Sequence, residues 1–282
     1  MTGGDPVNTG GRLAFIGGGN MAAALVGGLL RRGVPPTQIA VAEPHEERRR
    51  WLRAQFGVET FSDNTLAAAQ SDVIVLAVKP QAMREVSLAL APRLAESTAL
   101  VISVAAGIPL AALERWFGTR RGIVRTMPNR PALNGYGATA LVAPERTGRS
   151  QRERAESIMG AVGVTVWLTD ESQMDVVTAL SGSGPAYFFL FMEALESAAR
   201  NLGLTGEVAH RLTLATALGA ARLADEAAEP LATLREQVTS KGGTTEAALA
   251  VLETAELRAT IARAVAAAAR RSVELAAEFG LP

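Results

Sequence analysis

Short apolar runs alternate with helical patterns along the first 170 residues of the chain. The apolar runs are rich in β-branched residues and bounded by Gly, Pro or polar residues, so they predict buried strands at Leu13–Ile16, Ile39–Ala42, Val73–Val78 and Leu100–Val104. The stretches between them predict helices over Met21–Arg32, Glu46–Phe56 and Gln81–Leu90. This alternation predicts a parallel sheet with right-handed crossovers. Additional strands are expected towards its far end, at Ile123–Thr126, Ala138–Val142 and Val164–Leu168.

The pattern changes after about Asp170. From Ser172 to Phe279 no segment predicts a strand, and Ala and Leu form apolar stripes at helical spacing. Gly203, Pro230 and Gly242–Gly243 are expected breaks between helices at Ala186–Leu202, Gly206–Glu226, Thr244–Leu252 and Glu256–Phe279. Parts of these helices, especially Leu212–Leu223 and Ala262–Ala269, are apolar on most faces and must be buried. A helix–helix dimer interface is the favoured interpretation, with packing against the first domain as the alternative.

Composition and charge exclude several classes of function. The chain has 28 basic and 28 acidic residues, so it lacks the positive excess that nucleic-acid binding needs. It has no Cys, which excludes disulfides and thiolate chemistry and suits a reducing compartment, and its two His, at positions 45 and 210, do not predict a metal site. No apolar run approaches the roughly 20 residues of a membrane helix, and the polar start, residues 1–11, is no signal peptide. We therefore expect a soluble cytoplasmic protein without metal, nucleic-acid or membrane partners.

A glycine-rich turn joins the first predicted strand to the first predicted helix. Residues 17–22 read Gly-Gly-Gly-Asn-Met-Ala and fit the pattern Gly-x-Gly-x-x-Ala. Gly17 permits the tight turn, Gly19 lets a pyrophosphate approach the backbone, and Ala22 still allows close packing of the helix on the sheet. Because the motif follows a strand and opens a helix, it predicts dinucleotide binding in a Rossmann-type domain. A methyltransferase that binds S-adenosylmethionine at this turn is the alternative.

The choice between NAD and NADP stays open at this point. The second strand is expected to end near Glu43, where an acidic residue would accept a hydrogen bond from the ribose 2′-hydroxyl and favour NAD. Arg48, Arg49 and Arg50 follow closely, and an arginine there could hold the 2′-phosphate of NADP. The run of three arginines also fits a solvated helix face.

Five further segments resemble signature stretches of one enzyme family. They are Val78–Pro80, Val104–Gly107, Met127–Pro131, Ser181–Tyr187 and Val238–Thr245. Together with the glycine-rich turn they occur in the order, and over roughly the span 12–275, of the pyrroline-5-carboxylate reductases, so the chain resembles that family. Two departures are visible: Lys241 stands where many members have Pro, and the stretch 225–238 is one residue longer than the family pattern. No acidic substrate-site residue is therefore carried over from that stretch.

The resemblance implies an activity and an architecture. The activity is NAD(P)H-dependent hydride transfer to the imine of L-1-pyrroline-5-carboxylate, which gives L-proline in the last step of proline biosynthesis. The fold is α/β: a flexible N-terminal extension (1–11), a dinucleotide-binding Rossmann-type parallel-sheet domain (12–170), and an all-helical substrate-binding and dimerisation domain (171–282). The resemblance also implies a homodimer through the helical domain, and such dimers commonly build decamers.

The same resemblance implies two sets of site residues. NADP(H), or alternatively NAD(H), is expected at Ile16, Gly17, Gly18, Gly19, Asn20, Met21, Asn64, Ala77, Val78, Lys79, Pro80, Val104, Ala105 and Ala106. The substrate carboxylate is expected at Ser240, Gly243, Thr244 and Thr245, on a loop that in the family completes an active site shared across the dimer. Thr245 is the catalytic candidate, with its hydroxyl near the imine nitrogen.

Reduction of an imine suits a chain that has few Tyr, Lys and His residues to act as a general acid. A ketone reductase needs a positioned acid for the developing alkoxide, whereas a Schiff base can be protonated before the hydride arrives. Gly242 and Gly243 expose backbone N–H groups beside a helix start, which suits a carboxylate anchor, although an ordinary capped helix would look the same. A β-hydroxyacid dehydrogenase would use a lysine of the helical domain, and residues 170–240 contain none. A non-enzymatic nucleotide-sensing scaffold would not need the loop.

The two lysines and the segment Ser181–Pro185 each have two possible explanations. Lys79 and Lys241 are the only lysines among the 28 basic residues, and both fall inside motifs. Either these positions require a compact ammonium group, or the placement is a coincidence. Lys79 is expected near the nicotinamide ribose or at a strand end. In Ser181–Pro185, Pro185 fits the first turn of a helix, so helix crossing and substrate contact both explain the glycines.

Overall fold

The computed structural model describes residues 7–279, which form two compact units. The first, called the sheet unit here, contains residues 7–183 and the C-terminal residues from Ala268 onward. The second, the helical unit, is Gly184–Ala267.

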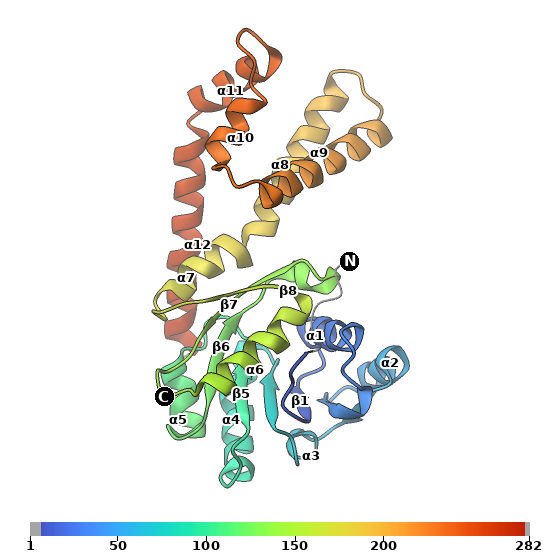
Figure 1. Ribbon diagram of the computed structural model, residues 1–282, viewed down its shortest axis with the longest axis vertical. Coiled ribbons are helices and arrows are strands. Elements are labelled where there is room, and N and C mark those ends of the chain that lie inside the picture. Colours follow the sequence, from blue (N-terminus) through green and yellow to red (C-terminus); the bar gives the residue numbers. More distant parts are fainter. Residues whose placement is uncertain (1–6, 280–282) are drawn as a thin grey trace. The chain divides into compact units, whose positions relative to one another are not determined.

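The sheet unit is built on a single mixed sheet (Figure 1). In the described residues it has eight strands in the order β3-β2-β1-β4-β5-β6-β7-β8. Their bounds are β1 Leu13–Ile16, β2 Ile39–Ala42, β3 Glu59–Phe61, β4 Val73–Leu76, β5 Leu100–Ser103, β6 Ile123–Met127, β7 Gly137–Val142 and β8 Gly163–Trp167. Strands β1 to β6 are parallel, as predicted, whereas β7 is antiparallel to β6, and β8 is parallel to β7.

The sheet is not parallel throughout: β7 runs antiparallel to β6 near the far end, where the sequence pattern predicted strands without giving their direction. Residues 128–136 connect β6 to β7 through one short 3₁₀ turn, Arg130–Asn134. A parallel crossover needs about a dozen residues or more, so this short connection forces the chain to return beside β6 in the opposite direction.

Helices cover both faces of the sheet, which makes three layers (Figure 1). One face packs against α1 Asn20–Arg31, α2 Glu46–Phe56 and α6 Arg149–Met159. The other packs against α3 Asn64–Ala68, α4 Pro80–Leu94, α5 Leu110–Phe117 and α7 Gln173–Val177. Alternate strand residues enter the two cores; Phe15 faces one and Ile16 the other, and both are fully buried. Burial on both faces explains why the central strands are continuous apolar runs rather than alternating ones.

The long predicted elements are confirmed, and short or polar ones were missed. All seven predicted strands are present within two residues of their expected ends, and so are the four helices after position 184. Sequence patterns did not predict β3, α3, α5, α6, α7 or the helix α10 Leu231–Gln237. Three of these have only three to five residues, and α6 buries only Ala155, Ile158 and Met159 among arginines and glutamates, so its apolar stripe is too weak to recognise.

The N-terminal residues and the end of the chain also belong to the sheet unit. Residues 1–6 of the predicted extension lie outside the described residues, while Thr9 is buried and the N–H of Asn8 donates to Ser157 Oγ at 2.9 Å. Near the other end, the hydroxyl of Ser272 donates to Asp175 Oδ1 at 2.6 Å. This contact joins the last helix, α12 Leu257–Phe279, to α7 within the sheet unit.

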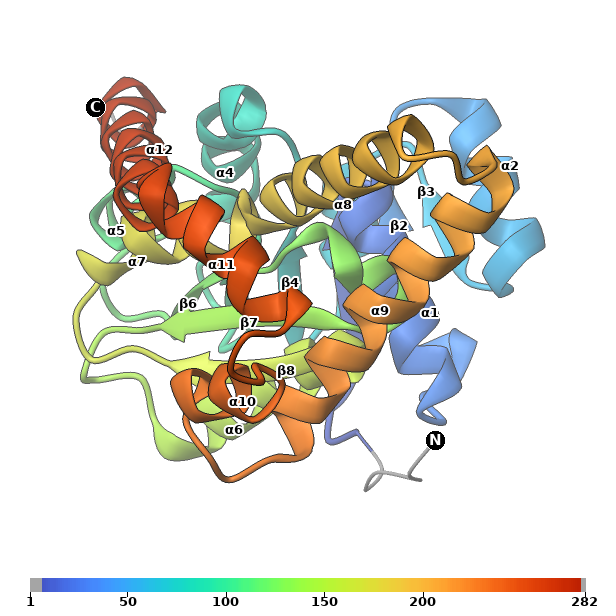
Figure 2. The ribbon, with the colours of Figure 1, turned by 90° about the horizontal axis from the view of Figure 1, so that it is seen from above.

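The helical unit has almost no core of its own. It contains α8 Gly184–Asn201, α9 Gly206–Glu226, α10, α11 Thr244–Thr254 and the first part of α12. Helices α8 and α9 lie side by side as a hairpin (Figure 2). Among residues 184–267 only Gly184, Ala209 and Thr213 are buried, while Phe188 and Leu190 are 71% and 67% exposed. A soluble monomer rarely leaves so much apolar helix surface in water, so the chain presents an interaction surface here.

A partly buried ion pair connects three elements of the sheet unit. Arg125 on β6, whose side chain is 7% exposed, contacts Glu171 with 2.6 Å between its Nη1 and Oε1. The same carboxylate oxygen accepts the N–H of Leu110 at 2.7 Å, at the first residue of α5, which has no side-chain cap of its own. Glu171 therefore neutralises a buried guanidinium and satisfies a helix N-terminus at once.

Replacement of Glu171 by Ala is expected to lower the free energy of unfolding by about 2–3 kcal/mol, because it leaves Arg125 buried without a partner. The control is Glu153→Ala, which breaks an exposed pair with Arg149 and should cost less than about 0.5 kcal/mol. Urea unfolding at pH 7 and equal protein concentration measures both. Equal losses in the two variants would contradict the structural role of the Arg125–Glu171 pair.

Candidate functional site

The carboxyl ends of β1, β2 and β4 meet at Gly17. The N–H of Gly17 donates to the carbonyl of Ala42 at 2.9 Å, and the N–H of Ala77 donates to the carbonyl of Ile16 at 2.8 Å. Gly17 has φ +100°, and a Cβ built there would lie 2.8 Å from the carbonyl oxygen of Ala77. The turn between β1 and α1 therefore requires glycine at this position for both conformation and space.

The N-terminus of α1 is open and lacks a side-chain cap. Gly19 precedes the helix with φ −68° and ψ −171°, and no side chain hydrogen-bonds to the first turn. Gly19 and Asn20 are exposed, and a Cβ built on Gly19 would meet nothing within 4 Å. The first-turn N–H groups have no carbonyl partner within the helix, and the helix dipole favours an anion there. Open space and free donors together fit the pyrophosphate of a dinucleotide.

The peptide groups of Gly18 are held from two sides by residues that follow β2. Its N–H donates to Glu43 Oε2 at 3.0 Å, and its carbonyl accepts from Arg48 Nε at 2.7 Å. The other oxygen of Glu43 accepts the N–H of His45 at 3.0 Å, and the Glu43 side chain is buried. The sequence pattern suggested a cofactor contact for Glu43, and for Arg48 either a cofactor contact or a solvated helix face; no sequence signal indicates these hydrogen bonds.

The remaining predicted cofactor residues follow neighbouring strands at the same edge of the sheet. Residues 77–80 come directly after β4 and lead into α4, with Lys79 exposed at the N-cap. Residues 104–106 come after β5, and the N–H of Val104 donates to the carbonyl of Leu76 at 3.1 Å. Asn64 opens α3 after β3. In open α/β sheets ligands bind outside the carboxyl ends of the strands, and the predicted residues gather at that edge.

Asp63 caps the short helix that begins with Asn64. Its Oδ1 accepts both the N–H of Thr65 at 2.6 Å and the hydroxyl of Thr65 at 2.7 Å. These hydrogen bonds hold the pKa of the Asp63 carboxyl below its usual range, because they stabilise the charged form. The cap therefore persists at neutral pH and fixes the backbone at Asn64.

The predicted substrate residues form a tight turn in the helical unit. The N–H of Gly243 donates to the carbonyl of Ser240 at 3.0 Å, and Gly242 has φ +70°. The N–H of Gly242 donates to Glu246 Oε2 at 2.7 Å, so the first turn of α11 holds the loop that precedes it. Thr244 and Thr245 are the first two residues of α11, whose N-terminus has no side-chain cap. Four predicted residues thus surround one free helix N-terminus, which suits a carboxylate.

Two other motifs contact each other within the sheet unit. The side-chain N–H of Asn129 donates to the carbonyl of Ser181 at 3.0 Å, and its Oδ1 accepts the N–H of Ala138 at 2.9 Å. Ser181 lies in a π-helical turn, Thr178–Gly182, and the next helix, α8, begins at Gly184 rather than at the expected Ala186. Asn129 therefore fixes a rare backbone conformation, and such π turns occur frequently at functional sites.

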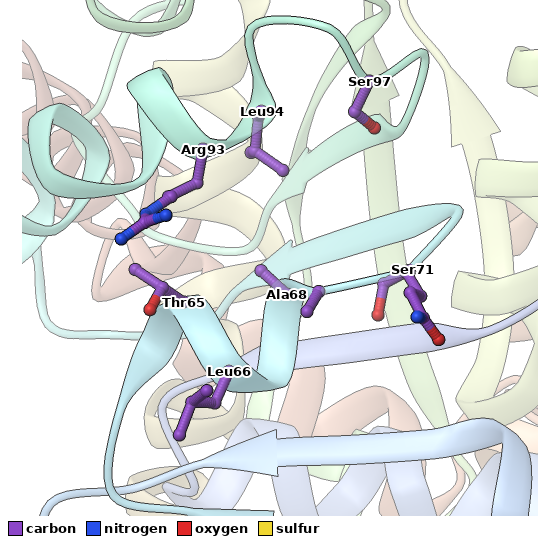
Figure 3. A pocket seen from close by; sticks show the side chains of 9 residues that line it. Thr65, Leu66, Ala68, Ser71, Arg93, Leu94 and Ser97 are labelled. Carbon is purple, nitrogen blue, oxygen red and sulfur yellow. The ribbon is translucent and has the colours of Figure 1, made fainter.

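A cavity of about 410 Å³ lies at the opposite, amino-terminal edge of the sheet (Figure 3). It is lined from α3, from the end of α4, and from the segments before β4 and β5 by Thr65, Leu66, Ala68, Ala69, Gln70, Ser71, Arg93, Leu94 and Ser97. None of the predicted site residues lines it.

Residues 7–279 contain neither a cluster of metal ligands nor a membrane-spanning helix. No group of three or more His, Asp or Glu side chains there is arranged to hold a metal ion. No helix in the same range is long and apolar enough to span a membrane.

Comparisons with known proteins agree with the geometry of both units. Residues 171–275 match the family model described as pyrroline-5-carboxylate reductase dimerisation, and residues 12–107 match the model described as NADP oxidoreductase, coenzyme F420-dependent. The pyrroline-5-carboxylate reductases of Pseudomonas aeruginosa and Haemophilus influenzae are 49% and 46% identical to this chain, in each case over 95% of this chain and 98% of the relative.

Solved structures give the same result. A pyrroline-5-carboxylate reductase from Coxiella burnetii superposes with a TM-score of 0.90 at 46% identity, covering 94% of this chain and 98% of that one. The Plasmodium falciparum pyrroline carboxylate reductase with NADP bound superposes with a TM-score of 0.84 at 29% identity, covering 97% and 100%.

The two outer glycines of the turn are expected to respond differently to alanine. Gly19→Ala should leave the free energy of unfolding within about 0.5 kcal/mol, because its backbone angles suit alanine and the space is open. It should nevertheless weaken NADPH binding about tenfold or more, because the methyl group occupies the approach of the pyrophosphate. Gly17→Ala should lower the free energy of unfolding by about 2–3 kcal/mol.

Fluorescence titration with NADPH and urea unfolding measure the two effects on the same preparations. Unchanged NADPH affinity in Gly19→Ala would mean that the cofactor does not approach this turn.

Proposed function

The chain belongs to the pyrroline-5-carboxylate reductase family, and we propose which of its residues bind the cofactor and which bind and orient the substrate. The protein is an oxidoreductase that uses NADP(H) and reduces the cyclic imine L-1-pyrroline-5-carboxylate to L-proline. The observation that carries this function is the 49% identity to the Pseudomonas aeruginosa relative, which extends over 95% of this chain and so spans both units. The open N-terminus of α1 behind the glycine turn supplies the matching site for the cofactor phosphates.

The edge of the sheet that holds residues 16–21 is proposed as the cofactor site. The N–H groups at the start of α1 bind the pyrophosphate, and the close approach needs the missing Cβ of Gly19. Residues 77–80 and 104–106, which follow β4 and β5, and Asn64 lie at the same edge of the sheet and are proposed to contact the rest of the cofactor. The bound cofactor supplies the hydride. The residues of the chain bind and orient the cofactor and the substrate and provide the surrounding charges, as is usual in cofactor-dependent enzymes.

The turn between α10 and α11 is proposed as the anchor of the substrate carboxylate. Ser240, Gly243, Thr244 and Thr245 offer hydroxyl and backbone donors around the free N-terminus of α11. Thr245 is proposed to place its hydroxyl beside the imine nitrogen. Because the imine is protonated before the hydride arrives, this site orients the substrate and needs no strong acid.

The helical unit is proposed to form a homodimer, with larger rings such as a decamer built from dimers. The proposal is supported by the match of residues 171–275 to a dimerisation model and by the exposed apolar side chains of α8 and α9. Burial of those side chains between two subunits would supply the core that the helical unit lacks.

Light scattering coupled to size-exclusion chromatography tests the assembly. The expected mass is a multiple of twice the chain mass of 29.4 kDa, and Phe189→Asp, at a side chain that is 61% exposed on α8, should shift the mass towards that of one chain. As the control, Glu207→Gln on the exposed start of α9 should leave the mass unchanged. A wild-type mass of 29.4 kDa would overturn the dimer.

Thr245→Ala is expected to lower kcat about 10- to 100-fold with L-1-pyrroline-5-carboxylate, because a hydrogen bond to a charged group is lost. The matched control is Thr254→Ala, at the exposed opposite end of the same helix, which should retain wild-type rates. NADPH oxidation measured with and without substrate gives both values.

Equal activity of wild type and Thr245→Ala would remove the catalytic role of Thr245 and leave the family function standing. Absence of substrate-dependent NADPH and NADH oxidation in folded wild-type protein would overturn the function itself.

A further inference from the structure

The residues that follow β2 decide how the chain discriminates between NADPH and NADH. In a Rossmann-type unit the residue just beyond the second strand lies beside the 2′-position of the adenosine ribose. Glu43 occupies this position directly after β2. A free carboxylate there would accept hydrogen bonds from ribose hydroxyls and repel a 2′-phosphate, so its actual partners are informative.

Both oxygens of Glu43 are occupied by backbone N–H groups. One accepts from Gly18 at 3.0 Å and the other from His45 at 3.0 Å, and the residue is only 8% exposed. The carboxylate therefore faces the glycine turn and connects it to the start of α2. This is the role of a positioning residue, because it acts on the cofactor site through Gly18.

The arginines of α2 differ in what they bind. Arg49, Arg50 and Arg53 all pair with Glu46, and Arg49 also donates to the carbonyls of Glu43 and Pro44. Arg48 has no carboxylate within ion-pair distance among the described residues. Residues 43–53 contain four arginines and three glutamates and so carry a formal charge of +1, and Arg48 is the arginine that stands outside the cluster around Glu46.

Arg48 is also held in a fixed orientation. Its Nε donates to the carbonyl of Gly18 at 2.7 Å, and its guanidinium carbon lies 4.1 Å from the centre of the Trp51 ring. Stacking on an aromatic face and one hydrogen bond restrict the guanidinium but leave its two terminal nitrogens for another acceptor. A planar, pre-oriented guanidinium of this kind is suited to a phosphate group.

We propose that Arg48 selects NADPH by binding its 2′-phosphate, and that Glu43 fixes the glycine turn instead of binding the ribose hydroxyls of NADH. The proposal rests on the proposed function, since it concerns the same cofactor site. It pairs the oriented guanidinium of Arg48 with the 2′-phosphate, the one group that distinguishes the two cofactors.

Isothermal titration calorimetry with cofactor fragments tests the proposal without any turnover. The probes are 2′,5′-ADP and 5′-AMP, which differ only in the 2′-phosphate, together with NADPH and NADH. Wild-type protein is expected to bind 2′,5′-ADP and NADPH at least tenfold more tightly than their counterparts. In Arg48→Gln this ratio should fall about tenfold, whereas Arg50→Gln, at an exposed neighbour paired with Glu46, should keep it.

Glu43→Gln separates positioning from ribose binding. The amide offers only one acceptor for the two N–H groups, so the turn loosens and both cofactors should lose affinity by a similar factor. A selective loss of NADH binding in this variant would overturn the role given to Glu43. Thermal unfolding without ligand checks that both variants remain folded.

The outcomes distinguish this proposal from the proposed function. Binding of NADPH and NADH with equal affinity, or an unchanged ratio in Arg48→Gln, overturns the selection by Arg48 and leaves the reductase function intact. Failure of folded wild-type protein to bind either cofactor overturns both.

Discussion

The hydrogen bonds that converge on the glycine turn are the constraint on which the cofactor edge depends. Gly17 donates to the end of β2, and Ile16 accepts from the residue after β4, so three strand ends are fixed at one point. No side chain fits at Gly17, because a Cβ would meet the carbonyl of Ala77. The position of α1, and with it the open helix N-terminus, follows from this crowding.

Most of the charged side chains around this turn are hydrogen-bonded or ion-paired. Glu43 and Arg48 hold the two sides of the Gly18 peptide, and Glu46 gathers three arginines of α2. The pKa of Glu46 lies below its usual value, chiefly because Arg49 hydrogen-bonds to it, so the cluster stays charged at neutral pH. A chain with no net formal charge thereby keeps a local positive excess where an anionic ligand is expected.

The two units differ in how each is stabilised. The sheet unit buries both faces of its strands under helices and holds Arg125 against Glu171 inside. The helical unit leaves large apolar side chains in water along α8 and α9. This exposure agrees with the match of residues 171–275 to a dimerisation model, since such helices gain a core only against a second surface.

The strand–helix alternation, the glycine turn and the family could all be predicted from the amino-acid sequence, because continuous apolar runs and short motifs are local signals. The sequence could not determine the direction of β7, which follows from the short 128–136 connection, or the partner of Arg125, which lies 46 residues away. It also left the role of Glu43 open: an acidic residue after β2 suggests ribose binding, and only the tertiary structure shows its oxygens turned to Gly18 and His45. Hydrogen bonds between segments that are distant in the sequence depend on how the layers pack, and a local sequence pattern does not specify that packing.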